Sequence, residues 1–348
     1  MANDNPLKPQ LKSLLAGRSL SESDAEQVLR TLADSALAPA VAGAVLAALS
    51  AKGVTADELR GFARAMRELA RKPQLPSGLL AVDIVGTGGD ASGSLNISTG
   101  TALLAAACGL PVVKHGNRAI SSRSGSADVL EQLGLHLPLD ETTAGACLAA
   151  TGFTFLFAPH YHPAMKAVAP VRAALGVRTV FNIMGPLTNP AAPPFAVIGA
   201  FDLPTAILMA KAILRSGIER AFVVHSLNGW DEPTPIGPFT IFDVHGGQVA
   251  RSERAPADYG LAVCRPEALA GDDAVHNAAA IRAVLRGEDR GAHRDALLLG
   301  ASLALEVTGL VAAPQQGVAL AAAAIEDGRA AAVIERLVSF GATQELKP

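Results

Sequence analysis

The spacing of apolar positions divides the chain into two parts, and the first 75 residues follow a helical pattern. Apolar side chains recur at helical intervals at Leu59, Phe62, Ala63, Met66, Leu69 and Ala70. Ser23 with Glu26, and Thr55 with Glu58, have the spacing of capping boxes, which predicts that a helix starts at each pair. Residues 71–78 contain two prolines that break this pattern, so they are interpreted as a linker.

From Leu79 onward, short apolar runs alternate with helical segments. The predicted strands are residues 79–85, 111–114, 153–158, 195–201 and 221–225. Such alternation is typical of an α/β fold with a largely parallel sheet covered by helices, in which ligands bind at the carboxyl ends of the strands. Residues 239–250 favour a hairpin that turns at Gly246-Gly247. Residues 162–184 form another helical stretch, which we expect to fold back onto the amino-terminal helices.

Composition and charge narrow the class of protein. Half of the residues are hydrophobic and only 4% are aromatic, which suits an alanine-rich α/β enzyme. The formal net charge of −3 gives no electrostatic reason to expect nucleic-acid binding. Residues 1–10 lack the pattern of a secretory signal, and the cysteines Cys108, Cys147 and Cys264 lack zinc or redox spacing, so we expect a cytoplasmic protein. The apolar run 35–51 is shorter than the roughly 20 residues of a membrane span and is predicted to be a buried helix.

The most informative motif follows the first predicted strand. Residues 86–90 read G-T-G-G-D, and residues 92–99 then open an apolar helix. Glycines let backbone N–H groups turn inward, and a helix start adds unpaired N–H groups, so together they form a cradle for an anion such as pyrophosphate. Asp90 indicates a cation or a sugar hydroxyl between its carboxylate and the phosphates. A tight strand-to-helix turn without a ligand is the alternative.

A second polar loop follows the next predicted strand. Residues 114–118 read K-H-G-N-R, and residues 121–126 add serines, glycine and Arg123 before a helix that starts near Ala127. If the two strands are neighbours, Lys114, Arg118 and Arg123 are placed to contact phosphate oxygens. A solvated basic surface loop is the alternative.

Three further features have a chemical and a plain structural interpretation. His160 and His162 have the spacing of a shared metal site, but no third ligand stands near, so His160 is expected to order a loop. Arg172 is suited to a bidentate contact with a substrate carboxylate, or to an ordinary surface contact with a glutamate. The adjacent carboxylates Asp231 and Glu232 suit magnesium at a strand end, or else lie in a surface loop.

Taken together, these segments resemble anthranilate phosphoribosyltransferases over nearly the whole chain. The resemblance is carried by the ordered motifs G-T-G-G-D, N-I-S-T, K-H-G-N-R, S-G-S-A-D-V-L, H-Y-H-P-A-M, A-P-V-R, G-P-L-T-N-P and D-E. It implies a small helical domain, residues 1–75 completed by helices at about 162–190, hinged to a larger α/β domain of residues 79–161 and 191–348. It also implies a homodimer that transfers the phosphoribosyl group of phosphoribosyl pyrophosphate (PRPP) to anthranilate, with two Mg²⁺ ions per subunit.

The resemblance also implies a role for particular residues. Those expected around PRPP are Gly86, Gly89, Asp90, Ser94, Asn96, Ile97, Ser98, Thr99, Lys114, His115, Gly116, Asn117, Arg118, Ala119, Ile120, Ser121, Ser122 and Ser126. Those expected to contact anthranilate are Gly86, Asn117 and Arg172. Ser98 and Glu232 would hold one magnesium ion, and Asp231 and Glu232 the other.

Two other functions are considered beside this one. A pyrimidine nucleoside phosphorylase shares the fold and a glycine-rich loop, but Asn117 and the Asp231-Glu232 pair argue against it. A non-catalytic relative that binds nucleic acid would be basic and would have lost the cradle residues, whereas this chain is acidic and retains them. We therefore expect neither nucleic acid nor a membrane as a partner.

Overall fold

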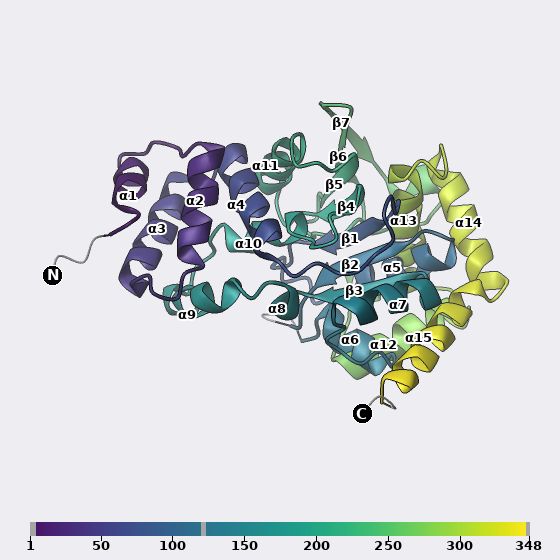
Figure 1. Cartoon of the computed structure of the whole chain (residues 1–348). Helices are drawn as coiled ribbons and strands as arrows, with labels where there is room; N and C mark the ends of the chain where they lie inside the picture. The colour runs from purple at the N-terminus through teal and green to yellow at the C-terminus, as the bar shows by residue number, and fades with distance from the viewer. Residues whose placement is uncertain (1–4, 120–122, 346–348) are drawn as a thin grey trace.

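The amino-terminal part folds into a bundle of helices. The computed structural model describes residues 5–119 and 123–345. The helices of this part are α1 Lys8–Leu15, α2 Glu22–Leu32, α3 Pro39–Lys52 and α4 Ala56–Leu69. Two later helices, α9 Met165–Leu175 and α10 Phe181–Met184, join them: α9 packs on α3 and α10 on α4. Figure 1 shows these helices as a lobe beside the rest of the molecule, and the expected return of the chain to the amino-terminal helices is confirmed.

Of the two predicted capping boxes, the one at the start of α4 is present and the one at the start of α2 is not. Thr55 and Glu58 form the predicted capping box of α4, with each side chain bonded to the other's backbone N–H. The predicted box of Ser23 and Glu26 is wrong, because the cap of α2 is Ser21, whose hydroxyl accepts the N–H of Asp24 at 3.1 Å. Serine stands at both positions, and the extended backbone at the earlier one places its oxygen over the first turn.

The larger part is built on a seven-stranded sheet. Its strands are β1 Val82–Gly86, β2 Val112–Gly116, β3 Phe153–Phe157, β4 Phe195–Gly199, β5 Arg220–Ser226, β6 Phe239–His245 and β7 Gln248–Arg254. Their order is β3-β2-β1-β4-β5-β6-β7; the first five are parallel, and β6 and β7 are added antiparallel. This confirms the mostly parallel sheet and the hairpin at Gly246-Gly247. The first strand starts later than predicted, since residues 77 and 78 form a turn and Leu80 is 62% exposed.

Each face of the sheet belongs to a different apolar core. Along β4 and β5, Val197 and Phe222 contribute to one core, whereas Ile198 and Val223 contribute to the other. This is the alternation that a strand imposes on successive side chains. The second core is continuous with the buried residues of the helical bundle. The bundle is thus attached to the sheet by apolar packing.

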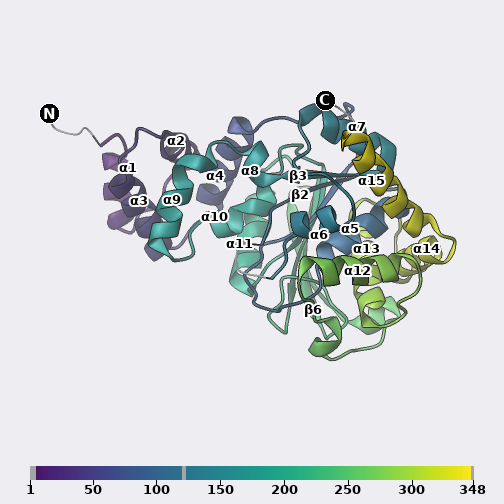
Figure 2. The same cartoon turned by 90° about the horizontal axis from the view of Figure 1, so that it is seen from below.

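The remaining helices cover the sheet and complete the chain. They are α5 Ile97–Ala107, α6 Ser126–Gln132, α7 Glu141–Thr151, α8 Ala158–Tyr161, α11 Leu203–Ile213, α12 Ala274–Leu285, α13 Ala292–Val307, α14 Pro314–Glu326 and α15 Arg329–Glu345, with 3₁₀ turns at Gly185–Leu187, Pro256–Tyr259 and Pro266–Leu269. Helices α5, α13, α14 and α15 gather on the side away from the bundle (Figures 1 and 2). Among the described residues, no helix is long and apolar enough to cross a membrane.

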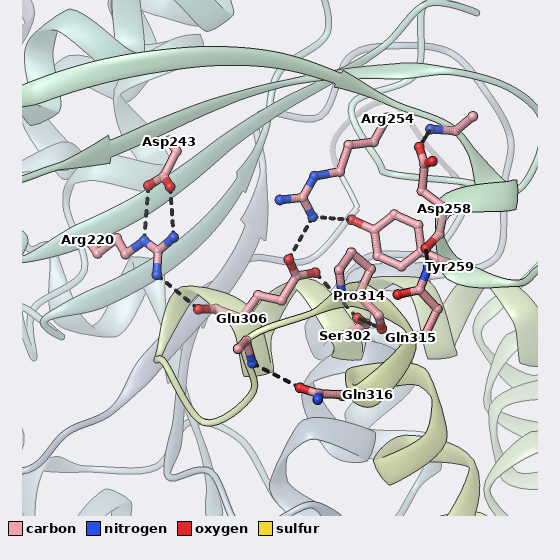
Figure 3. Close-up of polar contacts among 12 residues, drawn as sticks. Arg220, Asp243, Arg254, Asp258, Tyr259, Ser302, Glu306, Pro314, Gln315 and Gln316 are labelled. Atoms are coloured by element: carbon pink, nitrogen blue, oxygen red, sulfur yellow. Dashed lines mark hydrogen bonds and ion pairs between the residues drawn. The ribbon is translucent and has the colours of Figure 1, made fainter.

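A polar network ties the antiparallel edge of the sheet to the carboxyl-terminal helices (Figure 3). The Glu306 carboxylate, at the end of α13, accepts hydrogen bonds from Arg254 at 2.7 Å and from Ser302 at 3.4 Å. Arg254 also donates to the Tyr259 hydroxyl at 2.8 Å, and Arg220 donates to the Glu306 carbonyl at 3.2 Å. Because Glu306 is 6% exposed, its charge depends on these donors for solvation.

We expect Glu306→Ala to lower the free energy of unfolding by about 2 kcal/mol, because it leaves the partly buried Arg254 without its carboxylate. Urea denaturation followed by circular dichroism measures this change. Glu335→Ala, at an exposed position of α15, is the control and should change stability little. Equal stability of the two variants would contradict a stabilising role for the network.

Candidate active site

The glycine-rich loop and the second polar loop lie at the same edge of the sheet. Strands β1 and β2 are parallel neighbours that end at Gly86 and Gly116, so the loops that follow them start side by side. We call this side, where β1, β2, β4 and β5 end, the carboxyl edge. The first loop is fixed to β4: the Thr87 N–H donates to the Gly199 carbonyl at 2.9 Å. The adjacency on which the sequence argument depended is therefore confirmed.

Asp231 sits at the centre of the carboxyl edge. It is 6% exposed, and its carboxylate accepts the N–H of Gly88 while its own N–H donates to Asp90 at 3.3 Å. A Cβ atom at Gly86 would collide with this carboxylate, and one at Gly199 with the Asp231 carbonyl, so both strand ends require glycine. Burial and the negative charges of Glu232 and Asp90 raise the pKa of Asp231 well above its ordinary value.

Glu232 faces the start of α5. Its carboxylate accepts the N–H of Ser98 at 3.2 Å, at the positive end of that helix. Burial raises the pKa of Glu232 to about 7, against the opposing effect of Lys114. Ser98, Asp231 and Glu232 were expected to lie together as magnesium ligands. In the structure, Ser98 contacts Glu232.

Lys114 turns inward from β2. It is 1% exposed, and its ammonium group donates to the Ser98 hydroxyl at 3.2 Å and to the Ile84 carbonyl. Burial lowers its pKa, and the carboxylates of Asp83 and Glu232 oppose that effect. Lys114 thus supplies the positive charge beneath an acidic site.

The two arginines of the second loop are already paired with carboxylates. Arg118 forms ion pairs with Asp128 at 3.0 Å and with Glu131, and Arg123 pairs with Asp272 at 2.6 Å. The sequence does not reveal these acidic partners, which lie on α6 and directly before α12, and the contact of the two arginines with phosphate stays a prediction.

The backbone of the second loop is held by one acidic side chain. Asp128 accepts the N–H groups of Ala119 at 3.0 Å and Gly125 at 2.9 Å, and the Asn117 carbonyl accepts the N–H of Ala127. Helix α6 starts at Ser126, close to the predicted start. Three residues expected near PRPP, Ile120, Ser121 and Ser122, lie outside the described residues.

The histidines of the 157–166 segment have different partners. His162 lies 3.1 Å from His115, ring nitrogen to ring nitrogen, and His160 lies 3.7 Å from Glu141. Burial lowers the pKa of His162 to about 4 and that of His115 well below its ordinary value. The described residues contain no group of three or more His, Cys, Asp or Glu side chains arranged around a metal ion. A metal shared by His160 and His162 is thus not supported.

Arg172 has no glutamate partner among the described residues. Its guanidinium lies over the Phe181 ring, 5.2 Å from the ring centre, and forms no hydrogen bond or ion pair with residues 5–119 or 123–345. Burial lowers its pKa. The surface Arg–Glu contact considered from the sequence does not occur among the described residues, and within them this partly buried cation has no anion.

Arg178 was not singled out by the sequence. It follows α9, donates to the Gly89 carbonyl, and lies over the Phe201 ring at 4.2 Å from the ring centre. The Ser50 hydroxyl of α3 in turn donates to the Arg178 carbonyl at 3.4 Å. The arginine thus connects the helical bundle with the glycine-rich loop. Its place beyond the A-P-V-R segment, just after the glycine that ends α9, was the available signal.

Comparison with known proteins places the chain in a family. Residues 8–70 match the model of the glycosyl transferase family helical bundle domain, and residues 79–331 that family's a/b domain. The anthranilate phosphoribosyltransferase of Rubrobacter xylanophilus is 45% identical over 95% of this chain and 96% of its own length. The chain belongs to the anthranilate phosphoribosyltransferase family.

Two solved structures of that family share the fold. The enzyme from Thermus thermophilus superimposes with a TM-score of 0.89 at 43% identity and covers 95% of this chain and 98% of its own. The enzyme from Saccharomyces cerevisiae in complex with PRPP and Mg also gives 0.89, at 26% identity, covering 98% of this chain and 99% of its own. The resemblance proposed from motifs is therefore confirmed, as is the helical plus α/β architecture.

Proposed function

We propose that this protein transfers the 5-phosphoribosyl group of PRPP to the amino group of anthranilate and releases pyrophosphate. The observation that carries the proposal is the convergence of the glycine-rich loop, the start of α5 and the Asp231-Glu232 pair at one sheet edge, in a chain 45% identical to an anthranilate phosphoribosyltransferase. Inward backbone N–H groups suit phosphate oxygens, and adjacent buried carboxylates suit a divalent cation.

The PRPP site consists of the two loops and the first turn of α5, with the residues named from the sequence. The N–H groups of Thr87, Gly88 and Ser98 are taken by Gly199, Asp231 and Glu232 in this conformation, so phosphate oxygens are bound by the remaining N–H groups of the glycine-rich loop and the start of α5. Gly86 and Asn117 stand where the two substrates meet. Arg172 binds the anthranilate carboxylate from the helical side, because it is a partly buried cation whose guanidinium has neither a hydrogen-bond acceptor nor an anion among the described residues.

Magnesium fits the acidic residues of this edge. Burial first, and then repulsion from Glu232 and Asp90, raises the pKa of Asp231, and a hard divalent cation stabilises its charged form through oxygen ligands. Ser98 and Glu232 would hold one ion, and Asp231 and Glu232 the other. The described residues offer few protein ligands, which is the usual case for magnesium bound together with phosphates. Bound magnesium stabilises the negative charge of departing pyrophosphate.

The reaction then requires mainly binding and orientation by the chain. The anthranilate nitrogen forms a bond to the anomeric carbon of ribose as the bond from that carbon to the pyrophosphate oxygen breaks, and the amine proton leaves to solvent. Helix and loop N–H groups stabilise charge on the leaving group. Arg172 aligns the amine, and closure of the helical bundle over the loops excludes water. Arg178 already joins the two parts at Gly89.

A fluorescence time course tests the function. We expect anthranilate fluorescence to fall only when PRPP and magnesium are both present, with one pyrophosphate released per anthranilate consumed. Phosphate-dependent cleavage of thymidine or uridine without anthranilate consumption would favour a pyrimidine nucleoside phosphorylase instead. Calorimetric titration of magnesium in the presence of PRPP gives the number of ions per subunit.

We also propose a cytoplasmic homodimer formed through the helical bundle. Its α3 exposes Ala40, Ala44, Ala47 and Ala51 along one face, and Leu15 of α1 is 71% exposed. A second copy would bury this apolar face. Light scattering is expected to give twice the mass of one chain, and Ala47→Arg is expected to give the mass of a single chain.

A further inference from the structure

Asn277 connects the glycine-rich loop to a helix far along the chain. It lies in the first turn of α12 and is 1% exposed. Its side-chain amide donates to the Asn96 side-chain oxygen at 2.8 Å and to the Asp272 carbonyl at 3.3 Å, and its oxygen accepts the Asp272 N–H at 2.8 Å. Asn96 in turn donates to the Ser124 carbonyl at 3.1 Å. One chain of hydrogen bonds therefore joins residues 272–277, 96 and 124.

The direction of this chain of hydrogen bonds is fixed at both ends. The Asp272 N–H can only donate, so the atom of Asn277 that faces it is the oxygen, and its nitrogen faces Asn96. The Ser124 carbonyl can only accept, so the nitrogen of Asn96 faces it and the oxygen faces Asn277. Neither amide can be flipped without opposing two donors or two acceptors.

The segment before α12 also supports the first loop through its backbone. The Leu95 N–H donates to the Leu269 carbonyl at 2.9 Å, and the Gly271 N–H donates to the Gly93 carbonyl at 2.8 Å. A Cβ atom at Gly271 would collide with the Ser94 backbone, so the two segments lie in direct contact. Residues 93–96 are thus held from behind by residues 269–277.

We propose that Asn277 is a positioning residue for PRPP. It fixes the side chain of Asn96 immediately before α5, and through Asn96 it holds the glycine-rich loop against the second loop at Ser124. The two loops are then held in fixed relative positions beside one diphosphate, which lowers the reorganisation that binding requires. The inference rests on the proposed function, since it concerns the PRPP site named there. The alternative is that Asn277 only stabilises the start of α12.

Asn277→Asp tests the proposal, because aspartate has the same shape and still accepts the Asp272 N–H but cannot donate to Asn96. We expect the KM for PRPP and the calorimetric Kd for PRPP with magnesium to rise about tenfold, because the amide nitrogen's hydrogen bonds to Asn96 and to the Asp272 carbonyl are lost. The KM for anthranilate should stay within about twofold. His276→Ala, at the exposed neighbouring position, is the matched control and should change neither constant.

A double-mutant cycle separates positioning from stability. Asn277→Ala should weaken PRPP binding in the natural background and have no further effect on binding when Asn96 is already alanine. Additive effects on PRPP affinity, or a loss of thermal stability with unchanged PRPP affinity, would overturn the proposal. Asn277→Ala also serves if the aspartate variant does not fold. Calorimetry with PRPP needs no anthranilate, so it tests the role of Asn277 separately from the transfer reaction. A protein that binds PRPP but transfers nothing would refute the proposed function, and the effect of Asn277 on PRPP affinity would still be measured.

Discussion

Glu232→Gln is expected to lower kcat/KM for PRPP by about 100- to 1,000-fold, the usual effect of removing one preorganised group that stabilises charge in the transition state. Glutamine keeps the oxygen that accepts the Ser98 N–H at 3.2 Å, so the local geometry is retained. What is lost is the negative charge on which both proposed magnesium ions depend. Steady-state rates measured across a magnesium titration should show a higher magnesium requirement as well as a lower maximal rate.

The same substitution should not destabilise the protein in magnesium-free buffer. Burial, with a smaller contribution from Asp90, raises the pKa of Glu232 to about 7 against the opposing effect of Lys114, and an uncharged glutamine avoids the cost of burying that charge. We expect an unfolding temperature equal to or above that of the natural protein. Glu253→Gln, at an exposed position of β7, is the control for both measurements. Full activity at ordinary magnesium concentrations would show that Glu232 is no ligand.

The sequence predicted the fold well where local pattern and long-range packing agree. Strands β2 to β5 were found within a few residues because buried parallel strands are continuous apolar runs between turn residues. The return of residues 162–184 to the bundle was predicted, but its particular partner was not, since α3 lies over one hundred residues earlier. The cap of α2 was misplaced because Ser21 and Ser23 both satisfy the local rule, and backbone conformation decides between them.

The candidate site was predicted in its residues and less well in its contacts. Glycines at Gly86 and Gly89 and the Asp231-Glu232 pair are recognisable because few other residue types suit their chemistry. The partners of Arg118 and Arg123 could not be inferred, since Asp128 and Glu131 of α6 and Asp272, which precedes α12, come together only through the packing of these segments around the loop. Asn277 was missed for a similar reason. A single asparagine in an alanine-rich helix has no local signature, and its role depends on Asn96, which lies 181 positions earlier.

Arg172→Ala is expected to raise the KM for anthranilate by about 10- to 100-fold and to change the KM for PRPP little. The range is that of a charge-assisted hydrogen-bonded contact with a carboxylate. The guanidinium is partly buried, stacks on Phe181, and has no anionic partner among the described residues, so removing it leaves no protein charge unpaired there. The folded state should therefore tolerate the change. Steady-state kinetics with each substrate varied at saturation of the other measures both constants.

Two further variants make the assignment of Arg172 specific. Arg172→Lys retains the charge but loses the planar fork that binds a carboxylate through two parallel hydrogen bonds, so its KM for anthranilate should fall between those of the natural protein and the alanine variant. Lys166→Ala removes an exposed cation from the same helix and should leave both KM values unchanged. A lysine variant as impaired as alanine would indicate that geometry matters more than charge. Equal increases in both KM values would refute the assignment. A residue that contacts only anthranilate should not weaken the binding of PRPP to the loops of the carboxyl edge.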